Sequence, residues 1–128
     1  MKIIIVDDDP IYRFTFERVL KKINADFEVR SFENGEDLLN HCHAEEMDCT
    51  SVDLILLDIN MPVMDGWQFL EKFEPMYLAN ASLAAKLYIV SSSTNPVDVE
   101  HSKSFSSVAG YMVKPIAREK LKALVDSL

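Results

Sequence analysis

The 128-residue sequence lacks the features that mark several classes of protein. Its two cysteines, Cys42 and Cys49, are too few for a disulfide framework in a chain of this length. Its three glycines are scattered and form no glycine-rich phosphate loop, which counts against nucleotide binding. No apolar run approaches the roughly 18 residues of a membrane span. The short apolar run after Met1 stops at an aspartate cluster, with no signal-peptide cleavage site. We therefore expect a cytoplasmic protein with no membrane partner.

Basic charge is also scarce. Thirteen Lys and Arg residues against 21 Asp and Glu residues give a formal charge of −8. This balance argues against direct nucleic-acid binding, because phosphate contacts need a concentrated basic surface. An apolar content of 48% is enough for one core, and no repeat, low-complexity tract or linker divides the chain. We expect one domain over residues 1–128, and favour this over a domain cut from a longer hybrid kinase.

Five short segments predict buried strands. Four are apolar runs of three or four residues, and the fifth, at residues 29–32, is weaker. Continuous rather than alternating apolarity favours a parallel sheet covered on both faces. The strands are expected at residues 3–6, 29–32, 54–57, 87–90 and 111–113.

Helical patterns separate these segments. Asp9-Pro10 and Asn95-Pro96 each resemble an N-cap followed by proline at the first helical position. Asn34-Gly35 turns the chain into a second helix, and Asp65 is interpreted as the cap of a third that Pro75 interrupts. Residues 76–85 are either a loop or an extension of that helix. In the last helix, the expected apolar face comprises Ala117, Leu121, Leu124, Val125 and Leu128. The alternation predicts an α/β fold, a doubly wound (βα)₅ unit with helices on both faces of the sheet.

Charged and polar side chains follow four of the expected strands. Asp7-Asp8, Asp58, Ser91 and Lys114 come directly after strands one, three, four and five. The carboxyl ends of parallel strands share one edge of a sheet, so these groups are expected to converge there. Three nearby carboxylates repel unless a proton or cation neutralises them, and oxygen ligands without His or Cys suit Mg²⁺. An activated carboxylate can form an acyl phosphate, so the grouping fits phosphorylation by an outside donor.

The residues that carry a family resemblance lie in three segments. They are Val6-Asp7-Asp8-Asp9-Pro10, the run from Leu56 to Gly66 (LLDINMPVMDG), and Gly110-Tyr111-Met112-Val113-Lys114-Pro115. At these spacings the set resembles the response-regulator receiver family, of the single-domain, chemotaxis-regulator-like type. The resemblance covers nearly the whole chain. It implies a flavodoxin-like sheet order, 2-1-3-4-5, and a bacterial two-component signalling or phosphorelay function.

The resemblance also implies a role for each matching site residue. Asp58 matches the phosphoacceptor and Asp8 a direct Mg²⁺ ligand, with Asp58 itself as a second ligand. Asp7 matches an acidic residue acting through water, and Asn60 the residue whose backbone carbonyl completes the metal site. Lys114 matches the lysine that binds the phosphoryl group.

Three further matches concern activation and the space around the site. Ser91 matches the switch hydroxyl, and Tyr111 the aromatic residue that turns inward on activation. Ser92 occupies the small position beside the site, and members of the family usually have a cis bond before the proline that matches Pro115. The implied partners are a sensor histidine kinase or phosphotransfer protein and a downstream protein, which binds the face formed by the fourth helix, fifth strand and fifth helix.

Two other functions fit the sequence less well. A pseudo-receiver would keep the fold without phosphorylation, and the intact set of acidic, hydroxyl and lysine residues argues against it. An aspartate-nucleophile phosphatase acting on small molecules typically has a general-acid aspartate two residues after the nucleophile, where this chain has Asn60. We therefore expect a phosphoacceptor rather than an enzyme that turns over a separate substrate.

The segment His41-Cys42-His43, together with Cys49, contains metal-binding side chains. On a helix, His41 and His43 would point about 200° apart, and the spacing matches no standard zinc motif. We interpret the segment as a polar helix end with Cys42 packed inward.

Overall fold

The computed structural model describes residues 1–43, 51–80 and 83–128. Its five strands form one parallel sheet in the order β2-β1-β3-β4-β5, the order that the resemblance implied. The strands are β1 (Lys2–Val6), β2 (Glu28–Phe32), β3 (Leu54–Leu57), β4 (Lys86–Ser91) and β5 (Val108–Val113). The helices are α1 (Pro10–Ile23), α2 (Gly35–His43), α3 (Gly66–Ala79), α4 (Pro96–Ser102) and α5 (Arg118–Asp126).

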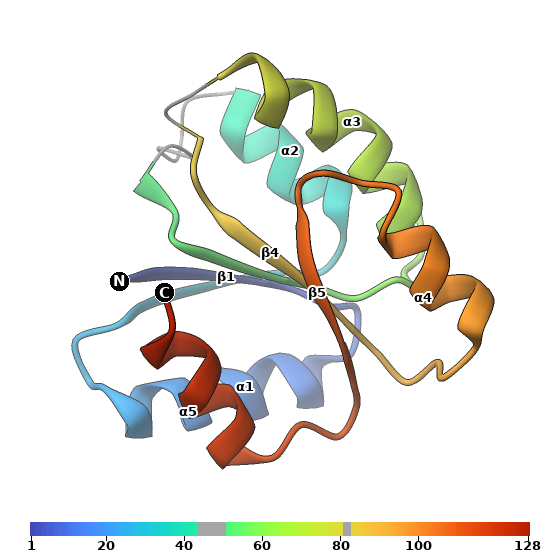
Figure 1. Ribbon diagram of the computed structural model, residues 1–128. Coiled ribbons are helices and arrows are strands. Elements are labelled where there is room, and N and C mark those ends of the chain that lie inside the picture. Colours follow the sequence, from blue (N-terminus) through green and yellow to red (C-terminus); the bar gives the residue numbers. More distant parts are fainter. Residues whose placement is uncertain (44–50, 81–82) are drawn as a thin grey trace.

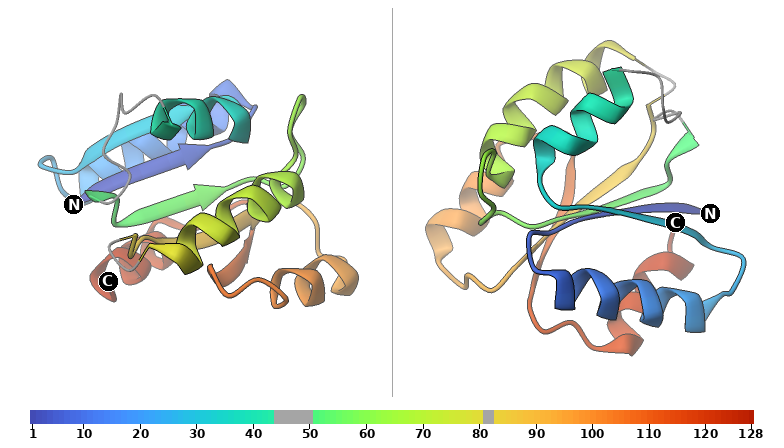
Figure 2. Two further views of the ribbon diagram at one scale, coloured as in Figure 1. Left: turned by 90° about the horizontal axis from the view of Figure 1, so that it is seen from above. Right: turned by 180° about the vertical axis from the view of Figure 1, so that it is seen from behind.

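The helices cover the two faces of the sheet. Figure 1 shows α1 and α5 on one face and α2, α3 and α4 on the other, and the view from behind in Figure 2 shows the same layers. Successive residues of the central strands point to opposite faces, so Ile4 packs with the core under α2 and α3, whereas Ile3 packs with the core under α1 and α5. Burial on both faces explains why the strands are continuous apolar runs.

The termini mark the end of the sheet that is remote from the expected site. Both lie at the same end of the sheet, beside the amino ends of the strands. The polar residues that follow the strands therefore gather at the opposite, carboxyl edge. No helix within the described ranges is long and apolar enough to cross a membrane.

Three of the helix starts confirm their predicted caps. The Asp9 side chain accepts a hydrogen bond from the Ile11 N–H, and that of Asn95 accepts one from the Val97 N–H. Asp65 forms a reciprocal capping box with Gln68. These residues explain where α1, α4 and α3 begin.

The prediction that Pro75 interrupts the third helix was wrong. Helix α3 continues through Pro75 to Ala79, the alternative allowed for residues 76–79. Proline removes one helical hydrogen bond, but Met76 and Tyr77 in the following turn pack against the core, and this burial offsets the loss. Residues 81–82 of the uncertain stretch lie outside the described residues.

The predictions for the last strand and helix need smaller corrections. Strand β5 begins at Val108, three residues earlier than expected, because its pairing with β4 extends past a register shift at Leu87. In α5, the side chains of Leu121, Leu124 and Val125 are buried as expected. Ala117 is instead the exposed N-cap residue, and Leu128 lies beyond the helix and is 41% exposed.

Candidate functional site

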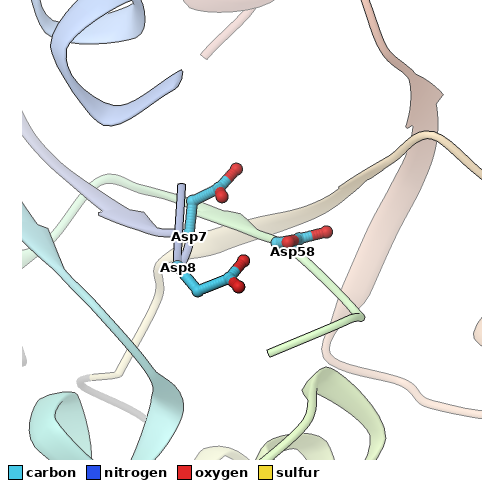
Figure 3. A group of neighbouring side chains, drawn as sticks. All are labelled: Asp7, Asp8 and Asp58. Carbon is cyan, nitrogen blue, oxygen red and sulfur yellow. The ribbon is translucent and has the colours of Figure 1, made fainter. Parts of the chain in front are cut away.

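Three carboxylates meet at the carboxyl edge of the sheet. Strands β1 and β3 are neighbours with Val6 opposite Leu57, so the residues that follow them, Asp7 and Asp58, lie side by side. Asp7, Asp8 and Asp58 each offer an oxygen within 4.8 Å of the others (Figure 3). Asp7 is 2% exposed and Asp58 6% exposed, whereas Asp8 is half-buried. The convergence predicted from the strand ends is present.

The loop after β1 is held by its own hydrogen bonds. The Asp7 carboxylate accepts a bond from the Asp9 N–H at 2.9 Å, and the Arg13 guanidinium donates to the Asp7 carbonyl oxygen at 2.7 Å. Because Asp9 also caps α1, the position of this helix relative to the carboxylates is fixed by local contacts.

The loop after β3 depends on a close backbone approach. The Gly66 N–H donates to the Ile59 carbonyl oxygen at 2.7 Å. A Cβ atom on Gly66 would lie only 2.6 Å from the Asp58 carbonyl oxygen, so the turn needs glycine at this position. Within the same turn, Val63 has a φ of 68°, in the left-handed region that a β-branched residue rarely adopts.

Lys114 supplies the positive charge of the site. Its ammonium lies 2.6 Å from Asp7 Oδ2 and 3.8 Å from Asp58 Oδ2. The Lys114 backbone N–H donates to the Ser91 carbonyl oxygen, and the following Lys114–Pro115 bond is cis, as the resemblance implied. The lysine is thus paired with Asp7, and Asp58 is the less compensated of the two buried carboxylates.

This arrangement changes the acidity of Asp58. Burial, followed by the charge of Asp7, raises the pKa of Asp58 from 3.8 to about 6. Lys114 and the Ile59 N–H, which donates to Asp58 Oδ1 at 2.9 Å, act in the opposite direction and only partly offset the rise. A bound cation would favour the ionised carboxylate.

The two predicted switch residues lie next to the site rather than in it. The Ser91 hydroxyl is fully buried and accepts a hydrogen bond from the Ser93 N–H at 3.1 Å. The half-buried Tyr111 donates from its hydroxyl to the Ser93 carbonyl oxygen at 2.8 Å. Ser91 and Tyr111 are therefore linked through the backbone of Ser93 in the loop between β4 and α4.

An open depression surrounds the carboxylates. It is lined by Asp7, Asp8, Asp9, Pro10, Tyr12, Asp58, Asn60, Ser92 and Lys114. The structure thus brings together every predicted phosphoryl and metal residue, with Ser92 beside them. Tyr12 is a member that the sequence reasoning missed, since it reads only as part of the apolar face of α1. Its ring centre lies 4.1 Å from the Lys114 ammonium.

His41 and Cys42 are not among the residues that line this site. His41 Nδ1 lies 2.8 Å from the Asp37 carbonyl oxygen, one turn earlier in α2. Cys42 packs against the core under α2 and α3, as predicted. The His43 side chain and Cys49 lie outside the described residues. Within the described residues, Asp7, Asp8 and Asp58 form a group of three side chains that could hold a metal ion.

Comparisons with known proteins agree with the fold. Residues 3–126 match the family model of the response regulator receiver domain. The transcriptional regulatory protein FlgR of Helicobacter pylori is 42% identical over 77 residues, which are 60% of this chain and 18% of FlgR. The nitrate/nitrite response regulator protein NarL of Escherichia coli is 32% identical over 95% of this chain and 52% of its own length.

Solved structures give the same result. The chemotaxis response regulator CheY4 of Vibrio cholerae is 27% identical over 99% of this chain and 98% of its own, with a TM-score of 0.75. The chain therefore belongs to the response regulator receiver domain family, the phosphoacceptor modules of two-component signalling. Members of this family are generally phosphorylated on an aspartate and bind Mg²⁺ at an acidic site. The chain spans about a fifth of FlgR and half of NarL.

Proposed function

We propose that Asp58 accepts a phosphoryl group from a phosphohistidine of a sensor histidine kinase or phosphotransfer protein. The observation that supports this most is the unequal charge compensation of the two buried carboxylates. Asp7 holds the Lys114 ammonium at 2.6 Å, whereas the Asp58 oxygen lies 3.8 Å from it, beyond hydrogen-bond distance. Asp58 also lines the open depression, so an outside donor can reach it.

The proposed transfer conserves the phosphoryl group. A carboxylate oxygen of Asp58 attacks phosphorus as the phosphorus–nitrogen bond of the donor breaks, and the imidazole keeps the bonding electron pair. The product is an acyl phosphate on Asp58. Lys114 stands beside both carboxylates and would stabilise the negative charge on the phosphoryl oxygens.

The residues present fit a Mg²⁺ ion. Asp8 and Asp58 would bind it directly, together with the backbone carbonyl of Asn60, and Asp7, which is engaged by Lys114, would act through water. Oxygen ligands with several retained waters are the usual environment of Mg²⁺. When bound, the ion supplies positive charge that neutralises the carboxylates and the incoming phosphoryl oxygens.

The proposed switch uses the loop between β4 and α4. The Ser91 hydroxyl turns from the Ser93 N–H toward the phosphoryl group, and Tyr111 leaves the Ser93 carbonyl to fill the space. One hydrogen bond to a charged group contributes roughly 1.5–3 kcal/mol, whereas a nearly complete population shift needs about 5.5 kcal/mol. Repacking of Tyr111 and the Lys114 contact must supply the remainder. The output surface is the face of α4, β5 and α5, and its partner is a protein.

We extend the proposal to the whole chain. Residues 1–128 act as one cytoplasmic receiver domain that works through protein partners and binds neither nucleic acid nor membrane. One observation argues against an enzyme with a separate substrate, because an amide at Asn60 cannot serve as the general acid of a phosphatase.

The test is the covalent phosphorylation of the purified protein. Incubation with phosphoramidate and Mg²⁺, followed by intact-mass measurement, should show a phosphate-sized gain that is absent in Asp58→Asn. The matched control is Asp53→Asn, because the exposed Asp53 precedes the opposite end of β3 and should leave the gain intact. No gain in the wild-type protein, with no Mg²⁺ binding, would favour the pseudo-receiver alternative.

A further inference from the structure

The aromatic ring of Tyr12 closes the site on the side of Lys114. The Lys114 ammonium lies 4.1 Å from the ring centre, and the lysine side chain is only 8% exposed. We propose that Tyr12 is a positioning residue, whose ring confines the Lys114 ammonium next to Asp7 and Asp58 and thereby speeds phosphoryl transfer. This inference rests on the proposed function of Asp58.

The sequence at the start of α1 places the ring there. Asp9 caps the helix and Pro10 occupies its first position, so Tyr12 falls in the first turn. Side chains on a helix lean toward its amino end, which here faces the loop after β1. The ring also contacts Phe16, with centres 5.8 Å apart, and packs against the core under α1 and α5. These contacts hold the Tyr12 ring on the side that faces the core.

The ammonium has three neighbours that were identified in the structure. Two are carboxylates, at 2.6 Å for Asp7 and 3.8 Å for Asp58, and the third is the Tyr12 ring face. Lysine has a flexible four-carbon stem and a strongly hydrated head, so an unconfined Lys114 would sample positions in water. A ring face attracts a cation without forming a directional bond. It can keep the ammonium in the pocket while the charge of Asp7 is exchanged for that of a phosphoryl oxygen.

Confinement affects the rate because the lysine must be in place before the transfer begins. Charged groups fixed ahead of reaction stabilise a transition state without the cost of reorganisation. A cation–π contact that is partly desolvated contributes enough to change a rate constant about threefold to tenfold. The effect should depend on the ring and not on the hydroxyl group.

The first experiment tests the geometry without a donor or Mg²⁺. In the NMR spectrum, the Lys114 side-chain protons should be shifted upfield by the ring in the wild-type protein and in Tyr12→Phe. They should move toward random-coil values in Tyr12→Leu. The dispersion of the remaining signals shows whether each variant is folded. Unshifted Lys114 protons in the wild-type protein would overturn the proposal.

The second experiment measures the rate of phosphorylation by phosphoramidate with Mg²⁺. Tyr12→Leu should be slower by about threefold to tenfold, whereas Tyr12→Phe should retain the wild-type rate. Phe14→Leu is the matched control, because Phe14 lies on the same helix and is 60% exposed, with Arg18 over its ring. Its rate should not change.

The outcomes distinguish a failure of the Tyr12 proposal from a failure of the proposed function of Asp58. Equal rates for wild-type protein and Tyr12→Leu, or equal losses in Tyr12→Leu and Tyr12→Phe, would overturn the role of the ring while leaving Asp58 as phosphoacceptor. A wild-type protein that gains no phosphate would overturn the proposed function and the role of Tyr12 together.

Discussion

Replacing Asp58 by asparagine should make the metal-free protein more stable. The pKa of Asp58 is raised from 3.8 to about 6, mainly by burial and then by the charge of Asp7. Keeping this carboxylate ionised in the folded protein therefore costs free energy. A difference of about two pKa units corresponds to about 3 kcal/mol. Asp58→Asn removes the charge, and its amide oxygen can still accept the bond from the Ile59 N–H.

The sign of the pH dependence follows from linkage. Below the unfolded-state pKa, near 4, Asp58 is protonated in both states and contributes no cost. Between this value and the folded-state pKa of about 6, the unfolded protein has lost the Asp58 proton while the folded protein keeps it, so the cost to stability grows as the pH rises. Above the folded-state pKa, the whole cost is present. Asp58→Asn should thus be more stable than the wild-type protein by about 3 kcal/mol above pH 7. The gain should be about half as large near pH 5 and small near pH 4.

The assay is urea unfolding with EDTA at several pH values between 4 and 8. The difference between variant and wild type cancels the titration of groups that both proteins share. Asp53→Asn is the control, since Asp53 is exposed and should show no comparable gain. Adding Mg²⁺ should stabilise the wild-type protein more than Asp58→Asn, because only the former keeps the full set of proposed ligands. A gain that is absent at pH 8, or that does not depend on pH, would refute the electrostatic reasoning.

Two further predictions concern the turn after β3. Val63→Asn should raise the free energy of unfolding by about 1 kcal/mol, because asparagine adopts the left-handed conformation at φ 68° more readily than valine; the urea midpoint measures this, and a lower midpoint would contradict it. Gly66→Ala should lower the free energy of unfolding by at least about 2 kcal/mol, because the new Cβ meets backbone atoms that cannot move aside. The same variant should be phosphorylated more slowly, as shown by intact mass over time, because the clash displaces Asp58.

The sequence predicts which residues gather at the carboxyl edge of the sheet better than it predicts how those residues pair with one another. The strands are short apolar runs, and polar residues follow them directly, so the convergence of Asp7, Asp58 and Lys114 required only a parallel sheet. The lateral order of the strands came from the family resemblance, because apolar periodicity does not say which strands are neighbours. The registers then place Val6 opposite Leu57 and bring the two aspartates together.

Several details depend on distances that no local pattern encodes. Helix α3 passes Pro75 because the next turn is buried, and that burial is a tertiary property. The left-handed Val63 is set by the closure of its turn. The pairing of Lys114 with Asp7 rather than Asp58, and the ring of Tyr12 above it, result from the relative placement of β5 and α1. The sequence places Lys114 near the two aspartates, but it does not determine which of them the lysine pairs with.

The pairing of Lys114 with Asp7 determines which carboxylates of the site a cation would neutralise. Three carboxylates and one ammonium leave two negative charges if all are ionised, and the ammonium sits on Asp7. The uncompensated charge is therefore concentrated on Asp8 and Asp58, which both line the open depression. In the proposed site, a divalent cation bound there would remove this excess and lower the cost of ionising Asp58. The burial that raises the pKa of Asp58 would thus also make the stability of the folded protein depend on a bound cation.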